Sequence, residues 1–280
     1  MKERIQFLFL YYIFWFTYFT CAKLIFLGYH ISEAKHLTLE LIYGVLKNSV
    51  VMDLSMAAYL SVIPFLLVTF SHYFKKSKLE SLLYSYTFFL TVIITFITVI
   101  DLEVYNVWKF RLDATPLNYL SSPKEAFASA KSSPLLQLFI SFLILLAIAS
   151  YFVYRIISHN LNKWKFTKKI PFIPVALVLT LLLTIPMRGS FSQQSLKPGQ
   201  LYFSDNYFVN ISTLNTPWYF GYSLLKQFDS KINPYSFFPR NIINQNLEKL
   251  YPATDKSFKP LIQVNKQTNV LMIVVESLTD

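Results

Sequence analysis

Long apolar runs alternate with short polar segments from the amino terminus to about residue 187. A helix of about 20 mostly apolar residues crosses the hydrocarbon core of a bilayer, which is about 30 Å thick. The pattern therefore predicts an α-helical polytopic membrane protein with five transmembrane helices, over residues 5–27, 54–74, 82–100, 135–157 and 171–187.

The first run follows Lys2 and Arg4, as a signal peptide also would. It is too long for the apolar region of a signal peptide and lacks a small-residue cleavage site, which favours a signal anchor. Lys23 near its far end is expected to snorkel to the membrane surface. Cys21 is expected to act as a small apolar side chain, since a single cysteine forms no internal disulfide.

Residues 28–51 mix polar and apolar side chains, which predicts a helix lying in the membrane interface and leading into the second span. Pro64 within the second span predicts a kink. The fifth span is the shortest, near the lower length limit for crossing.

Basic residues concentrate on alternate connections. Only 15% of the residues are charged, yet the net charge is +11, which raises the question of nucleic acid binding. The positions of the basic residues fit a cytoplasmic membrane rim better, because cytoplasmic loops are rich in lysine and arginine. An N-terminus in the cytoplasm places these residues there: Lys2, Arg4, Lys75, Lys76, Lys78, Arg155, Lys163, Lys165, Lys168 and Lys169. The longer loops on the other side hold fewer, and five crossings leave the chain after Met187 outside. No nucleic acid partner is expected.

The segment 188–268 is polar but contains aromatic residues throughout, which predicts an extracytoplasmic linker of short helices. Thr216 and Pro217 open a predicted helix over residues 218–228, capped by Asn215 or Thr216. A second helix is predicted over residues 241–251.

The last stretch, residues 269–280, differs in kind. Val270–Val275 is an unbroken apolar run, typical of a strand buried on both faces of a parallel sheet. Glu276 follows it, at the edge where open α/β sheets bind ligands. A carboxylate there suits a metal ion with oxygen ligands. Without further context, a plain solvated acid at a strand end is an equally good interpretation.

The pattern from Asn269 to Ser277 resembles the first strand of the alkaline phosphatase/sulfatase superfamily, and its Glu-Ser pair resembles the lipoteichoic acid synthase-like membrane proteins. The layout of the whole chain agrees with that branch. Further likeness lies in Arg111-Leu112-Asp113, in Pro116–Leu120 and Pro123–Glu125, and in Arg188-Gly189 with the later Asn206, Asn210 and Asn215. The resemblance implies three parts: a membrane domain (1–187), a helical linker (188–268) and the first strand of a truncated sulfatase-like α/β domain (269–280).

The resemblance also implies a site. Glu276 would be a ligand of a divalent ion (Mn, Mg or Zn). The family's nucleophilic threonine comes later in that domain, so no catalytic residue of this sequence is assigned. Ser277 is expected to cap a helix.

The implied activity is the metal-dependent transfer of a phosphoglycerol-type or related phospho-group from a membrane lipid to an envelope glycolipid or glycan, at the bacterial cytoplasmic membrane. A phosphoethanolamine transferase or a sulfatase-like hydrolase is the alternative within the superfamily. A non-catalytic membrane anchor is the alternative outside it, if the chain truly ends at Asp280.

Two sets of polar residues remain. The first lies near the outer ends of the second and third spans, and either forms a surface for lipid headgroups or consists of interface charges that pair with one another or with water: Asp53, Asp101, Glu103, Arg111 and Asp113. The second set is the four histidines, which have no ligand spacing and are expected at the surface or interface: His30, His36, His72 and His159.

Overall fold

The computed structural model describes residues 2–121, 124, 133–164, 172–189, 195–229 and 238–251. These residues form helices and connections, and no strand lies among them. Four of the helices are long and apolar enough to cross a membrane. The prediction of a helical membrane protein is confirmed at this level.

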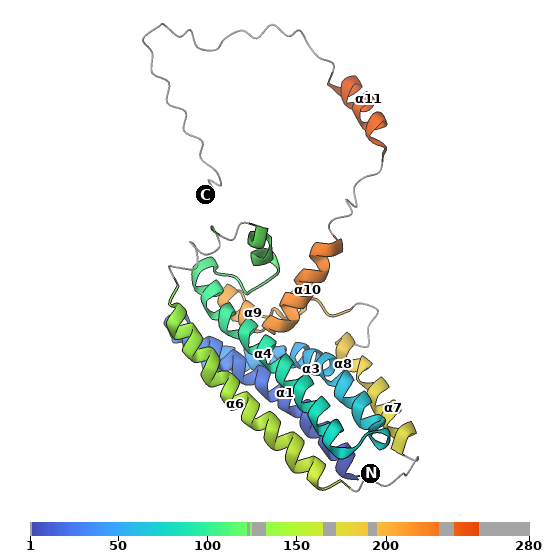
Figure 1. The fold of residues 1–280 in the computed structure, drawn as a ribbon. Coiled ribbons are helices and arrows are strands. Elements are labelled where there is room, and N and C mark those ends of the chain that lie inside the picture. Colours follow the sequence, from blue (N-terminus) through green and yellow to red (C-terminus); the bar gives the residue numbers. More distant parts are fainter. Residues whose placement is uncertain are drawn as a thin grey trace. The chain divides into compact units, whose positions relative to one another are not determined.

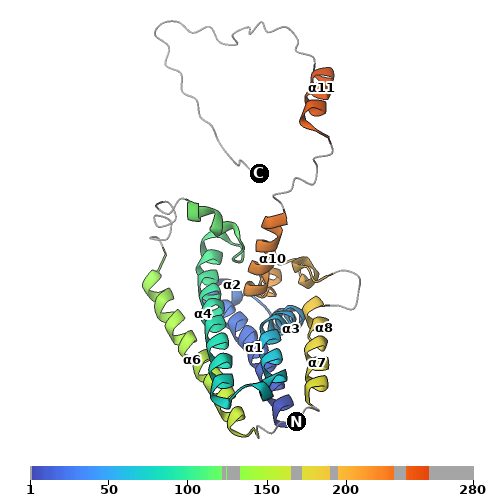
Figure 2. The same ribbon diagram turned by 45° about the vertical axis from the view of Figure 1, so that its right-hand side comes forward.

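The long helices lie side by side in one bundle (Figures 1 and 2). The four long helices are α1 (Lys2–Tyr29), α3 (Leu39–Thr69), α4 (Lys76–Trp108) and α6 (Leu135–Asn162). The shorter elements are α2 (Ile31–Ala34), η1 (Ser71–Tyr73), η2 (Thr115–Ser121), α7 (Phe172–Leu182), α8 (Thr184–Arg188), η3 (Pro198–Leu201), α9 (Tyr207–Ser212), α10 (Thr216–Asp229) and α11 (Arg240–Leu250). Helices α7 and α8 run along α3, and α9 and α10 lie at the end of the bundle opposite the N-terminus (Figures 1 and 2).

The long helices extend beyond the predicted apolar runs. Helix α3 is continuous from Leu39, where Thr38 caps it, so the predicted separate interfacial helix is wrong for that part. Helix α4 likewise runs past Ile100 to Trp108. Polar residues near a helix end keep their backbone hydrogen bonds within the helix, and a hydropathy pattern therefore does not mark the end.

The predicted fifth span is two short helices in the structure, α7 and α8, and both pack on α3. Helix α8 ends at Gly189, which adopts the left-handed conformation (φ 73°) and accepts no side chain there without strain. At the same place the Ser55 hydroxyl of α3 donates to the Met187 carbonyl at 2.8 Å.

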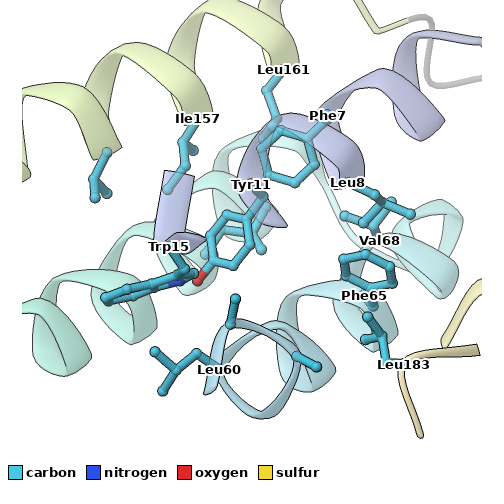
Figure 3. Close-up of a cluster of buried hydrophobic side chains, with 14 of the residues drawn as sticks. Phe7, Leu8, Tyr11, Trp15, Leu60, Phe65, Val68, Ile157, Leu161 and Leu183 are labelled. Atoms are coloured by element: carbon cyan, nitrogen blue, oxygen red, sulfur yellow. The ribbon is translucent and has the colours of Figure 1, made fainter. Parts of the chain in front are cut away.

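An aromatic core joins the helices inside the bundle. Figure 3 shows Phe7, Tyr11 and Trp15 of α1 between side chains of α3 and α6. All three are at most 1% exposed. Helix α1 packs mainly on α3, and α4 mainly on α6. Large rings at successive turns of α1 thus fill the centre of the membrane domain.

Threonines of α4 complete this core. Thr87, Thr91, Thr95 and Thr98 are buried, at a spacing of one helical turn, and three of them donate to the carbonyl four residues earlier. The Tyr11 and Tyr18 hydroxyls lie 3.0 and 2.9 Å from Thr87 and Thr95. Two tyrosine side chains of α1 therefore reach α4 and hydrogen-bond its threonines inside the bundle, and such interhelical hydrogen bonds help to join membrane helices.

Cys21 is exposed on α1 and lines an apolar hollow of about 320 Å³ between α1, α4 and α6. Only 11% of the residues in the most apolar stretch of α6 are buried, so most of the surface of this helix is exposed. Both observations fit helices whose solvent is lipid.

A second apolar cluster lies at the end of the bundle that bears α9 and α10. Phe26 and Tyr105 of the long helices contact Phe208 of α9, with ring centroids 5.9 and 5.6 Å apart. The predicted helix after Thr216 is confirmed as α10, and the Asn215 side chain caps it by accepting from the Trp218 backbone N–H at 3.1 Å. The linker before residue 230 therefore packs onto the membrane helices.

Residues 230–280 form a separate unit. Its described part is α11, which confirms the predicted helix over residues 241–251. The predicted strand Val270–Val275, Glu276 and Ser277 lie outside the described residues.

Candidate functional site: a buried charge cluster beneath α10

Six polar residues meet where α10 begins. We call them the charge cluster: Lys23 of α1, Asp53 of α3, Asp101 of α4, Arg111, Asn215 and Thr216. Each is 4% exposed or less. Segments distant in sequence thus contribute to one buried site.

The Lys23 ammonium pairs with the Asp53 carboxylate and joins α1 to α3. The Asn215 amide donates to the same carboxylate oxygen at 2.8 Å, and the Ser49 hydroxyl lies 3.4 Å from the other oxygen. Lys23 therefore does not snorkel to the surface as predicted. A carboxylate on the neighbouring helix offers it a partner inside the protein.

Arg111 makes the second ion pair. Its Nε and Nη2 atoms lie 2.8 and 2.7 Å from one oxygen of Asp101, and its Nη1 donates to the Ile211 carbonyl at 3.2 Å. The guanidinium also hydrogen-bonds Thr216 and lies 3.9 Å above the Phe26 ring. One arginine thus connects α1, α4, α9 and α10.

The Asp101 carboxylate accepts from the Leu112 backbone N–H at 2.7 Å and from the Thr216 hydroxyl at 2.9 Å. The formal charges of the two pairs cancel. A cavity of about 10 Å³ remains between Lys23, Arg111 and Asn215, about the size that holds one water molecule. The cluster is therefore satisfied internally and has no room for a larger ligand.

A further hydrogen-bond chain lies beside the cluster. The Trp218 indole of α10 donates to Ser55 of α3 at 3.0 Å, and Ser55 donates to Met187 of α8. Helix α10 is thus fixed to α3 and, through it, to the end of α8.

The remaining candidates of the predicted headgroup surface lie apart from the charge cluster. Glu103 accepts from the Tyr29 hydroxyl at 3.1 Å and is 8% exposed. Asp113 accepts from the Thr115 backbone N–H at 2.8 Å, within its own loop. The structure brings together only Asp53, Asp101 and Arg111 of the five, and it buries these three with their charges paired.

Glu33 of α2 makes a more exposed pair at the same end. Its carboxylate accepts from Tyr105 at 2.7 Å and from Lys109 at 3.0 Å. Burial alone would raise the pKa of Glu33, but these two hydrogen bonds and the Lys109 charge outweigh it and lower the pKa.

His30 is buried, 4% exposed, and the prediction that it lies at the surface is wrong. Its ring is surrounded by Phe26, Tyr29 and Tyr105, at centroid distances of 4.7 to 5.1 Å. Burial lowers its pKa, because the charged imidazolium loses its hydration among these rings.

Metal binding finds no support within the described ranges. No three His, Cys, Asp or Glu side chains gather there closely enough to hold an ion. Glu276, the ligand implied by the resemblance, lies outside those ranges. Comparisons with protein-family models, with curated proteins and with solved structures found no match.

Proposed function

We propose that this chain is the membrane-anchored part of a metal-dependent phospho-group transferase. The donor would be a membrane phospholipid with a phosphoglycerol-type or related headgroup, and the acceptor an envelope glycolipid or glycan. The proposal rests on the resemblance of Asn269–Ser277 and of the chain layout to the lipoteichoic acid synthase-like family.

The structural support for the proposal is the attachment of α10 to the membrane helices, which a non-catalytic anchor would share. Two buried ion pairs, the Asn215 cap and the Trp218–Ser55 hydrogen bond hold it. An enzyme that acts on headgroups needs its catalytic domain near the bilayer surface. Attachment of the linker up to Asp229 shortens the free tether to a later domain, and a shorter tether confines that domain to a smaller volume.

The proposed topology has five crossings, with α7 and α8 together as the fifth. The N-terminus lies at one end of the bundle, together with the loop between α3 and α4 and the end of α6 (Figure 1). Lys2, Arg4, Lys75, Lys76 and Lys78 lie in these segments, and their positive charges favour a cytoplasmic location for this end. The α9 and α10 end is then extracytoplasmic.

The metal would be held by Glu276 with ligands from the domain that its strand opens. When bound, such an ion polarises a phosphoryl oxygen and activates a nucleophile. One carboxylate does not make a catalytic site, which has three or more protein ligands in zinc enzymes. Residues 1–280 alone should therefore insert into membranes but turn over no phospholipid.

The test uses the protein translated from the complete reading frame that contains this sequence. Glu276→Gln keeps the size of the side chain but removes its charge. It should abolish lipid turnover and lower metal content, with membrane insertion unchanged. Glu276→Asp should retain part of the activity, and excess metal should restore more. Unchanged metal content and rate in Glu276→Gln would end the claim that Glu276 is a ligand.

The second candidate, a non-catalytic membrane anchor, is favoured by the same attachment of α10. A reading frame that stops after Asp280 supports it. A frame that continues through a threonine and further Asp and His residues supports the enzyme.

A further inference from the structure

A second concave surface lies between η3 and α10, away from the charge cluster. This groove has a volume of about 550 Å³, within the range of about 300–1,000 Å³ typical of small-molecule sites. Lys197, Gly199 and Tyr202 line it from the η3 side. Four residues of α10 line the opposite side: Tyr219, Tyr222, Ser223 and Lys226.

The α10 residues share one helix face, because they follow the spacing i, i+3, i+4 and i+7. Tyr222 is fixed by stacking on Trp218, with centroids 5.2 Å apart and planes at 15°. The Lys226 ammonium lies 5.0 Å from the Tyr222 ring centre. The face therefore presents an oriented ring, hydroxyl groups and a cation.

The lining carries two positive charges and no carboxylate. Lys197 and Lys226 form no ion pair with any described acidic residue. Burial raises the pKa of Tyr202 and of Tyr219, so both phenols stay protonated and can donate hydrogen bonds at neutral pH. An anion with hydrogen-bonding groups complements this lining.

Both walls are fixed by contacts outside the groove. Leu196 lies before η3 and Leu201 is its last residue, and both are 5% exposed within the second apolar cluster. The Lys197 backbone N–H donates to the Gln200 side chain at 3.2 Å. Helix α10 is held by the charge cluster. A preformed groove loses less entropy on binding than one that must order first.

We propose that this groove binds an anionic, hydroxyl-rich ligand, a sugar or polyol that bears a phosphate. The lysines would hold the phosphate, and the tyrosines would cover one face of the ring or polyol and bond its hydroxyl groups. The ligand is either a soluble phosphorylated sugar or the headgroup of a lipid. A lipid headgroup is included because η3 follows closely on the end of α8. Binding is measured without turnover, so this proposal stands or fails apart from the proposed function.

The first arm titrates the purified chain in neutral detergent with glucose 6-phosphate and with glucose by calorimetry. The second arm reconstitutes the chain with phosphatidylinositol or with phosphatidylcholine and counts retained lipid by native mass spectrometry. The test variant is Lys197→Glu with Lys226→Glu. Its matched control is Lys35→Glu with Lys47→Glu, which changes the net charge equally at two exposed lysines outside the groove.

A steric variant keeps both lysines. A Cβ added at Gly199 meets no atom within 4 Å, so a side chain can begin there, and Gly199→Leu is designed to narrow the groove. Gly221 of α10 is equally open but does not line the groove, and Gly221→Leu is the control.

We expect the lysine variant and Gly199→Leu to weaken binding at least tenfold, and both controls to bind as the unaltered chain does. Binding of glucose 6-phosphate identifies a soluble source, and selective retention of phosphatidylinositol alone identifies a lipid source. No binding in either arm would overturn the proposal. So would equal binding of glucose, or binding that neither groove variant weakens.

Discussion

Lys23, Asp53, Asp101 and Arg111 are charged side chains almost completely withdrawn from solvent. Removing charges from water costs several kcal/mol for each ion, and only good geometry and further hydrogen bonds offset that cost. Here each carboxylate has such additional donors, from Asn215 in one case and from Leu112 and Thr216 in the other. The pairs therefore specify which segments meet.

Breaking one pair should be strongly destabilising. Asp53→Asn leaves the Lys23 ammonium buried without a counter-charge, and we expect it to lower the free energy of unfolding by about 3–5 kcal/mol. Lys23→Met combined with Asp53→Leu should recover only part of that loss, because the buried Asn215 amide then has no acceptor at Asp53. Glu33→Gln, which breaks the exposed Lys109 pair, is the control and should cost about 0–1 kcal/mol. Denaturant unfolding in detergent measures all three, and equal losses in Asp53→Asn and Glu33→Gln would contradict the account.

His30 should make stability depend on pH. Its pKa is below 6.5 in the folded protein, so the unfolded chain binds the proton more readily. The stabilisation is present above the unfolded-state pKa of about 6.5 and is lost as the pH falls below that value. Glu33 does not titrate in this window, because its pKa is lowered from 4.5.

Thermal unfolding between about pH 7.5 and 5.5 tests this expectation. His30→Phe keeps an aromatic ring and should reduce the acid-dependent loss, whereas His36→Gln, at an exposed position, should leave it unchanged. A loss of the same size in His30→Phe would show that another group causes it.

Helix α10 is the element that attaches the linker to the membrane helices. Its first turn combines two functions of Asn215, whose Oδ1 caps the helix while its Nδ2 donates to Asp53. A cap alone stabilises a helix by about 1 kcal/mol. The link to a buried carboxylate makes this cap part of the tertiary structure as well.

Asn215→Ala should therefore loosen α10 more than the loss of an ordinary cap does. We expect faster amide hydrogen exchange throughout α10, with little change in the cores of α1 and α3. Thr38→Ala, which removes the exposed cap of α3, should affect only the first turn of that helix. Exchange confined to the first turn of α10 in Asn215→Ala would mean that its link to Asp53 does not hold the helix.

The sequence predicts local features well here and distant pairings poorly. Apolar runs identify the four long helices, and the sequence offers Asn215 or Thr216 as the cap of the helix at Pro217, of which the structure shows Asn215. The pairing of Lys23 with Asp53 was missed, since a lysine near a helix end is equally compatible with snorkelling. No periodic pattern relates Asp53 to Asn215, and only the packed helices bring them together.

The same limit explains why the sequence did not predict the burial of His30 or the full lengths of the helices. A single histidine after an apolar run gives no sign that Phe26 and Tyr105 will surround it. The start of α3 at Leu39 is set by the Thr38 cap, whereas the hydropathy pattern marks only its later part.

At the scale of the whole molecule, the membrane domain has two different ends (Figure 2). One carries the N-terminus and its basic residues. The other bears the charge cluster, α9 and α10, and through them the chain that leads toward Glu276. In the proposed topology, these ends lie on opposite sides of the membrane.

Cysteine labelling on intact cells tests that topology most directly. In a Cys21→Ala background, Ser77→Cys and Ser195→Cys each place one thiol at an exposed position, on opposite ends of the bundle. A membrane-impermeant maleimide should label Ser195→Cys on intact cells, and Ser77→Cys only after the membrane is opened. Labelling of Ser77→Cys from outside, with Ser195→Cys protected, would contradict the account.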